Sequence, residues 1–238
     1  SPDLADAYAS RGAAYGKKGN LDMAITDLNE ALRLNPKNIE GHKNRAVLYL
    51  KKNDFNAAID DLSEVIRLNP KAESIYLLRG TVYSSKHDFD HGISDFTAVL
   101  KLNATNTDAY AGRMSAYWFK GDYQNAAADC RMIVQLNPSD IHSCYNLALM
   151  LATCPSASAR DGKEAVEVAR KVCDLTGWKE PHCLAALAAA YAESGDFEQA
   201  VKYQKQALAI PGWADDEMQN RLGLYQQGKP YHEAPFQN

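Results

Sequence analysis

The sequence predicts an all-α protein, an α-solenoid of six helix-turn-helix units closed by a C-terminal capping helix. Its main support is a spacing of 34 residues at which three residue types recur through the first half of the chain. They are Tyr15, Tyr49, Tyr83 and Tyr117; Arg11, Arg45, Arg79 and Arg113; and Asp27, Asp61, Asp95 and Asp129. A regular period of this length is typical of stacked supersecondary units that bury their apolar faces against one another.

Each unit is expected to contain two helices joined by a short turn. In the first unit, the helical spacing of small and apolar residues predicts helices over residues 4–17 and 22–34. An asparagine or aspartate precedes the second helix of most units, where we expect it to act as the N-cap. These residues are Asn20, Asp54, Asp88, Asp122 and Asp196. A proline such as Pro36 then ends the unit.

Small residues recur where the two helices of a unit must approach closely, as at Gly12 and Ala24, Ala46 and Ala58. Together with the 34-residue period, these positions resemble the tetratricopeptide repeat (TPR) family, bacterial type. The resemblance implies a right-handed superhelix forming a single solenoid over residues 1–238. Its repeats are expected at residues 5–38, 39–72, 73–106, 107–140, 141–179 and 180–213, with a cap helix over 215–227 and a tail over 228–238.

The fifth unit departs from the period. Residues 153–162 separate a helix over 141–152 from one that resumes near Lys163. This insertion of about five residues is expected to lengthen a surface loop. Cys154 lies in that loop, so we expect its thiol to be exposed or to meet Cys173. The cysteines form no CxxC pair, which favours reduced packing residues and no metal site.

Composition narrows the possible partners and locations. The formal charge of -4 offers no basic field for nucleic acid, and the apolar stretch over residues 183–192 is too short to span a membrane. Reduced cysteines favour the cytoplasm, with the periplasm or attachment to a larger protein as alternatives.

Pro2 stands in the place of a proline that closes an earlier unit, so we expect a longer parent protein. A natural start or a processed signal sequence are the alternatives.

The recurring arginine and aspartate are 16 residues apart within each of the first four units, one on each helix. In the last two units both are replaced together, by Leu147 with Val168 and by Leu187 with Tyr203. Joint replacement predicts structural ion pairs that hold the two helices in register, either buried or exposed. A ligand-binding arginine stripe is the alternative.

The resemblance implies that the first helix of each repeat lines a concave peptide-binding groove. The positions that carry over are Lys17, Lys43, Lys51, Leu77, Thr81, Ser115, Trp118, Phe119, Tyr145 and Leu149, followed by a wall of small residues at Ala185, Ala189 and Ala192. Lysines beside an aromatic centre suit a peptide with acidic and apolar residues. Packing of Trp118 and Phe119 between helices is the alternative. The family's carboxylate clamp is incomplete, because Val47 and Leu78 stand where asparagines are needed.

No motif predicts catalysis or a cofactor. His87 and His91 straddle a turn and lack the glutamate of a metalloprotease motif, while His142 and His182 have no third ligand. We therefore predict a non-catalytic module that binds a protein or peptide in the groove. The alternative is a self-assembling scaffold that forms homo-oligomers through the solenoid ends or the convex face.

Overall fold

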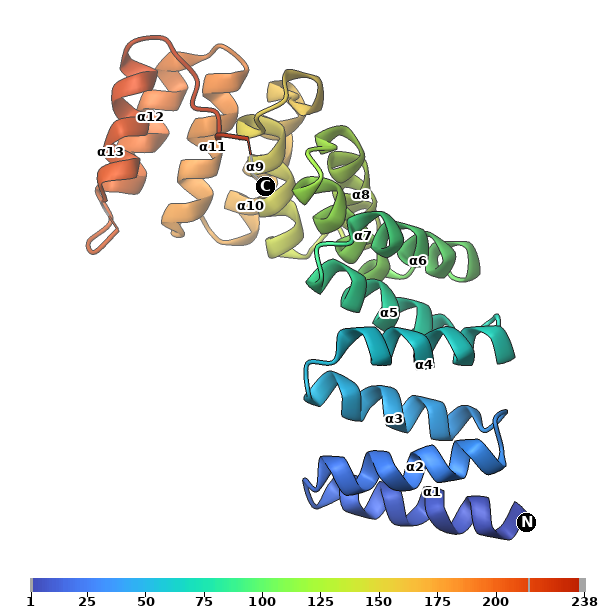
Figure 1. Cartoon of the computed structure of the whole chain (residues 1–238). Coiled ribbons are helices and arrows are strands. Elements are labelled where there is room, and N and C mark those ends of the chain that lie inside the picture. The colour runs from blue at the N-terminus through green and yellow to red at the C-terminus, as the bar shows by residue number, and fades with distance from the viewer. Residues whose placement is uncertain (1, 214, 236–238) are drawn as a thin grey trace. The chain divides into compact units, whose positions relative to one another are not determined.

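The computed structural model describes residues 2–213 and 215–235, and in these ranges the chain forms α-helices and one short 3-10 helix but no strand (Figure 1). The α-helices are α1 (Pro2–Lys17), α2 (Leu21–Leu34), α3 (Ile39–Lys51), α4 (Phe55–Leu68), α5 (Glu73–Ser85), α6 (Phe89–Leu102), α7 (Thr107–Phe119), α8 (Tyr123–Leu136), α9 (Ile141–Thr153), α10 (Gly162–Leu175), α11 (Pro181–Glu193), α12 (Phe197–Leu208) and α13 (Asp216–Gln226). The predicted all-α repeat fold is confirmed.

The chain divides into two compact units, Ser1–Gly112 and Arg113–Asn238. In the first unit, the helix pairs α1 with α2, α3 with α4 and α5 with α6 bury aliphatic and aromatic residues such as Leu28, Leu62 and Phe96. The second unit has its own core, to which α8 to α13 contribute and in which Leu151 and Leu187 are fully buried. Each unit therefore buries apolar helix faces in a core of its own.

Two positions show why small residues are needed where the helices of a pair cross. A Cβ atom on Gly12 would lie 3.0 Å from the backbone oxygen of Ala24, and one on Gly80 would lie 3.0 Å from the ring of Phe96. Contacts this short are tighter than nearly all real Cβ contacts. The glycines therefore allow the close helix approach that the repeat needs.

Most of the predicted N-caps form. The carboxylates of Asp54, Asp88, Asp122 and Asp196 accept hydrogen bonds from backbone N–H groups three residues later, at the starts of α4, α6, α8 and α12. Asn20 occupies the predicted N-cap position of α2, but its side chain makes no capping hydrogen bond to any residue that the structure describes.

The arginine and aspartate of each early repeat face each other across the helix pair. Arg79 donates from Nε and a terminal nitrogen to the two carboxylate oxygens of Asp95, at 2.8 and 2.7 Å. The same two-pronged geometry joins Arg11 to Asp27, Arg45 to Asp61 and Arg113 to Asp129. Arg79 also donates to the hydroxyl of Ser63, on the preceding helix pair, at 2.7 Å. The pairs thus link helices within a repeat and between neighbouring repeats.

The inserted segment of the fifth repeat is folded inward. Residues Ala157–Ala159 form the 3-10 helix, and Cys154 is fully buried against Tyr123 and Ala159. The expectation of an exposed Cys154 is therefore wrong, because the short helix lets the segment pack against α8. Among the described residues, all five cysteines are buried and free, so Cys154 and Cys173 form no disulfide.

The C-terminal end of the second unit consists of α13 and a segment that returns to earlier helices. Tyr225 of α13 is almost completely buried, so its ring packs into the core of the second unit. Residues 228–235 then run from α13 past α11 to α9 (Figure 1). The backbone N–H of Glu233 donates to the carbonyl of Thr153, the last residue of α9, at 2.8 Å. Residues 236–238 of the expected tail lie outside the described residues.

Candidate functional site

An open, mostly apolar pocket lies between α7 and α9 in the second unit. Its volume is about 300 Å³. The residues that line this α7–α9 pocket are Met114, Ser115, Trp118, Phe119, Asn146, Leu149, Met150 and Glu233. Four of the residues predicted for the groove, Ser115, Trp118, Phe119 and Leu149, are thus brought together here.

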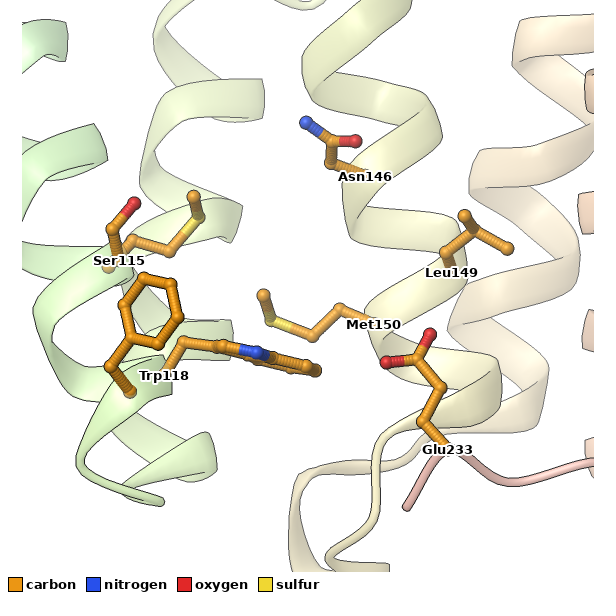
Figure 2. A pocket seen from close by; sticks show the side chains of 8 residues that line it. Ser115, Trp118, Asn146, Leu149, Met150 and Glu233 are labelled. Atoms are coloured by element: carbon orange, nitrogen blue, oxygen red, sulfur yellow. The ribbon is translucent and has the colours of Figure 1, made fainter. Parts of the chain in front are cut away.

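Helical spacing explains how these side chains reach one pocket. On α7, positions 115, 118 and 119 share a face, as do positions 146, 149 and 150 on α9. In the view of Figure 2, Met150 lies between Trp118 and Glu233, and the Ser115 and Asn146 side chains stand farther along the same two helices. Two helix faces therefore form apolar walls, with Ser115 and Asn146 towards one end and Glu233 towards the other.

The Trp118 side chain lines the α7–α9 pocket and also packs against the core. Its ring meets that of Tyr123 edge-on, with ring centres 4.9 Å apart, and it packs against the core residues Cys154 and Ala159. Phe119, the next residue, is 38% exposed at the pocket. The two alternatives considered for these aromatics therefore divide between them, because Trp118 is anchored in the core and Phe119 presents a surface to solvent.

Sequence reasoning missed four of the lining residues. Asn146 and Met150 could have been predicted, because Leu149 and Met150 follow Asn146 by three and four residues and so share its helix face. No sequence pattern indicates that Glu233 lines this pocket. It belongs to the segment after α13 and is positioned by contacts with Thr153, 80 positions earlier.

Tyr145 lies away from the α7–α9 pocket and lines a separate pocket of about 450 Å³ with His142, His182, Glu180 and neighbouring residues. Burial raises the pKa of Tyr145. The His182 ring contacts Trp213, with centres 3.8 Å apart. Both histidines thus face one space, yet the described residues hold no group of three or more His, Cys, Asp or Glu side chains arranged for a metal ion.

The lysines of the first unit separate into two groups. Lys17 and Lys51 line a pocket of about 210 Å³ between α1 and α3, over Gly12 and Gly16. Lys43 instead pairs with Glu40 at 2.8 Å on the exposed side of α3. On α5, Leu77 is half-buried and Thr81 is exposed, and neither lines the α1–α3 pocket.

The predicted wall of small residues on α11 is wrong. Ala185, Ala189 and Ala192 are each at most 3% exposed. The cause is that α11 packs against α9, α10 and α12 together, so its alanines fill the core of the second unit instead of facing a groove.

The repeat pattern is also found in comparisons with known proteins. Profiles of the tetratricopeptide repeat match residues 5–38, 39–72, 77–141 and 181–211, which together make up more than half of the chain. The chain belongs to the tetratricopeptide repeat family. TPR-family proteins are generally non-catalytic interaction modules, and the repeats of this chain are those of a protein–protein interaction module.

Solved structures share the fold at low sequence identity. MamA is 21% identical with a TM-score of 0.63, over 75% of this chain and 95% of that protein. YrrB, described as a TPR protein with an unusual peptide-binding site, is 18% identical with a TM-score of 0.64, over 80% of this chain and 94% of YrrB. PilF of Pseudomonas aeruginosa is 16% identical with a TM-score of 0.56, over 95% of this chain and 98% of PilF. No curated protein sequence matches the chain.

The helices of the described part of the chain are too short or too polar to cross a membrane.

Proposed function

We propose that the chain binds a peptide segment of a protein partner in the α7–α9 pocket, without catalysing a reaction. The observation that carries this proposal is the exposed Phe119 beside Trp118 and Leu149, in an open cavity with apolar walls. Aromatic residues in such positions are common interface hot spots. YrrB, which shares the fold, is described as having a peptide-binding site.

The size of the pocket favours a peptide over a small-molecule cofactor. A volume of about 300 Å³ is at the lower limit of ligand pockets, which run from roughly 300 to 1,000 Å³. One or two apolar side chains of a peptide suit this space, and each contributes about 1.5–3 kcal/mol when it leaves water. The rest of the peptide is proposed to lie along the exposed faces of α7 and α9.

The first unit supplies a second proposed contact. The ammonium groups of Lys17 and Lys51 border the α1–α3 pocket, and with Val47 they present a basic and apolar surface to acidic residues of the partner. Lys43 is less suited to this role because Glu40 already neutralises it. The chain's net charge of -4 supports a protein partner in preference to a nucleic acid.

A peptide library displayed on phage tests the proposal. The native chain should enrich a set of peptides, and Phe119→Ala combined with Leu149→Ala should weaken binding of those peptides by tenfold or more, because two apolar contacts are lost. Leu175→Ala is the matched control, since Leu175 is exposed on α10 and does not line the pocket. Circular dichroism checks that each variant is folded. Failure to enrich any peptide, or equal binding by the double variant, would contradict the proposal.

A further inference from the structure

The segment after α13 forms a strap, residues 229–235, that is fastened at three points in the second unit. The Arg221 guanidinium lies 4.2 Å from the centre of the Tyr231 ring. His232 Nε2 lies 2.7 Å from a carboxylate oxygen of Glu193, at the end of α11. The backbone N–H of Glu233 then donates to the carbonyl of Thr153 at 2.8 Å. The strap therefore joins α13, α11 and α9, as Figure 1 shows.

The inserted segment of the fifth repeat also contacts Glu193, the residue that holds His232 of the strap. Arg160 donates from Nε to Glu193 at 2.8 Å, and from a terminal nitrogen to the carbonyl of Cys154 at 2.7 Å. Glu193 is thus shared between Arg160 and His232 of the strap. Because the Arg160 and Glu193 side chains are 12% and 16% exposed, this link is mostly shielded from water and holds the strap in place.

This fastening puts a carboxylate in the wall of the α7–α9 pocket. Figure 2 shows the Glu233 carboxylate beside Met150, on the α9 side of the pocket. Among the described residues that line the pocket, Glu233 is the one that carries a charge. Its Oε1 lies 3.1 Å from the hydroxyl of Thr153, which also lies 2.9 Å from the carbonyl of Leu149.

The Glu233 carboxylate therefore has acceptor capacity left for a ligand. A carboxylate can accept about four hydrogen bonds, whereas the Thr153 hydroxyl has a single proton to share between two acceptors. Next to apolar walls, a bond between a carboxylate and a cationic donor is stronger than one between neutral groups. A second carboxylate brought to the same place is repelled.

We propose that Glu233 makes the α7–α9 pocket selective for a peptide that carries a lysine or arginine beside the apolar side chain that enters it. The proposal rests on the proposed function and names the chemistry of the partner. The strap is then a specificity element, since it positions the charge that apolar walls alone do not supply.

The same phage library, selected against the full chain and three variants, tests this assignment. The pool from the native chain should be enriched in lysine or arginine next to an apolar residue. Glu233→Gln keeps the shape and the Thr153 contact, and it should weaken a selected basic peptide about tenfold. Glu233→Lys should instead select acidic peptides. Glu198→Gln, on the exposed surface of α12, is the matched control and should bind as the native chain does.

The outcomes separate the two proposals. If peptides depend on Phe119 and Leu149 but show no basic preference, and bind Glu233→Gln equally, the charge selectivity is wrong and the pocket proposal stands. If no selected peptide depends on Phe119 and Leu149, the pocket proposal itself fails. A native pool in which the residue next to the apolar side chain is acidic also overturns the role given to Glu233.

Discussion

The paired arginine and aspartate side chains differ in their exposure to solvent. The Asp95 side chain is 5% exposed and that of Arg79 is 17%, whereas Arg11 in the first repeat is 59% exposed. The hydrogen bonds from Arg11 hold the pKa of the Asp27 carboxyl below its ordinary value. The aspartates are therefore buried anions, and the loss of the arginine would leave a buried charge without a partner.

Replacing Arg79 by alanine is predicted to lower the free energy of unfolding by about 3 kcal/mol, because the Asp95 carboxylate would stay buried without its partner. Urea unfolding followed by circular dichroism measures the change. Arg33→Ala is the control, since Arg33 is 67% exposed in its pair with Glu30 and its loss should leave the midpoint nearly unchanged. Equal midpoints for the two variants would show that Arg79 and Asp95 act as a surface pair.

The five cysteines are predicted to resist alkylation in the folded chain. Burial raises the pKa of Cys130 and of Cys173 to about 12, and it also raises the pKa values of Cys144, Cys154 and Cys183. The thiolate is the reactive form, so little of it exists at about pH 8. Iodoacetamide followed by mass spectrometry should label none of the cysteines natively and all of them in denaturant. Native labelling of Cys154 would show that the inserted segment is open.

At the scale of elements, the start of α10 depends on a glycine. A Cβ atom on Gly162 would lie 2.5 Å from the backbone nitrogen of Ser194 and 2.7 Å from the carbonyl carbon of Glu193, so the backbone at the end of α11 would have to move. We predict that Gly162→Ala destabilises the chain by about 1–3 kcal/mol, as overpacking does. The thermal midpoint measures this loss.

Gly223 provides the control for that substitution. It lies within α13, and a Cβ atom there would meet no atom within 4 Å. Gly223→Ala should therefore stabilise the chain by about 0.5–1 kcal/mol through helix propensity alone. If both alanine variants melt at the same temperature, the close approach of α10 to α11 is not a constraint on stability.

The elements that follow the repeat could be predicted from the sequence, and those that break it could not. The period predicted the helix pairs and the aspartate caps, and the resemblance to the TPR family implied that Trp118 and Leu149 share a groove. Cys154 was misplaced because an insertion has no counterpart in the other repeats. Glu233 was missed because its backbone N–H makes the contact with Thr153, and any residue except proline supplies that group.

At the scale of the whole molecule, the two compact units carry different surfaces. The first unit presents the lysine-lined α1–α3 pocket, and the second presents the apolar α7–α9 pocket with its single carboxylate from the strap. The core of the second unit is rich in alanine and cysteine along α9 and α11, which lets these helices pack closely while the strap crosses their ends. The second unit thus contains both the pocket and the strap, whose Glu233 places a carboxylate in the pocket wall.

Hydrogen–deuterium exchange of the full chain, with and without a peptide selected from the library, tests the central proposal most directly. Binding in the α7–α9 pocket should slow amide exchange at residues 114–119, 146–150 and 231–233. Helices α10 and α12, which do not line the pocket, should exchange as in the free chain. Protection confined to α10 and α12, with the pocket residues unchanged, would contradict the proposal and move the binding surface to these helices.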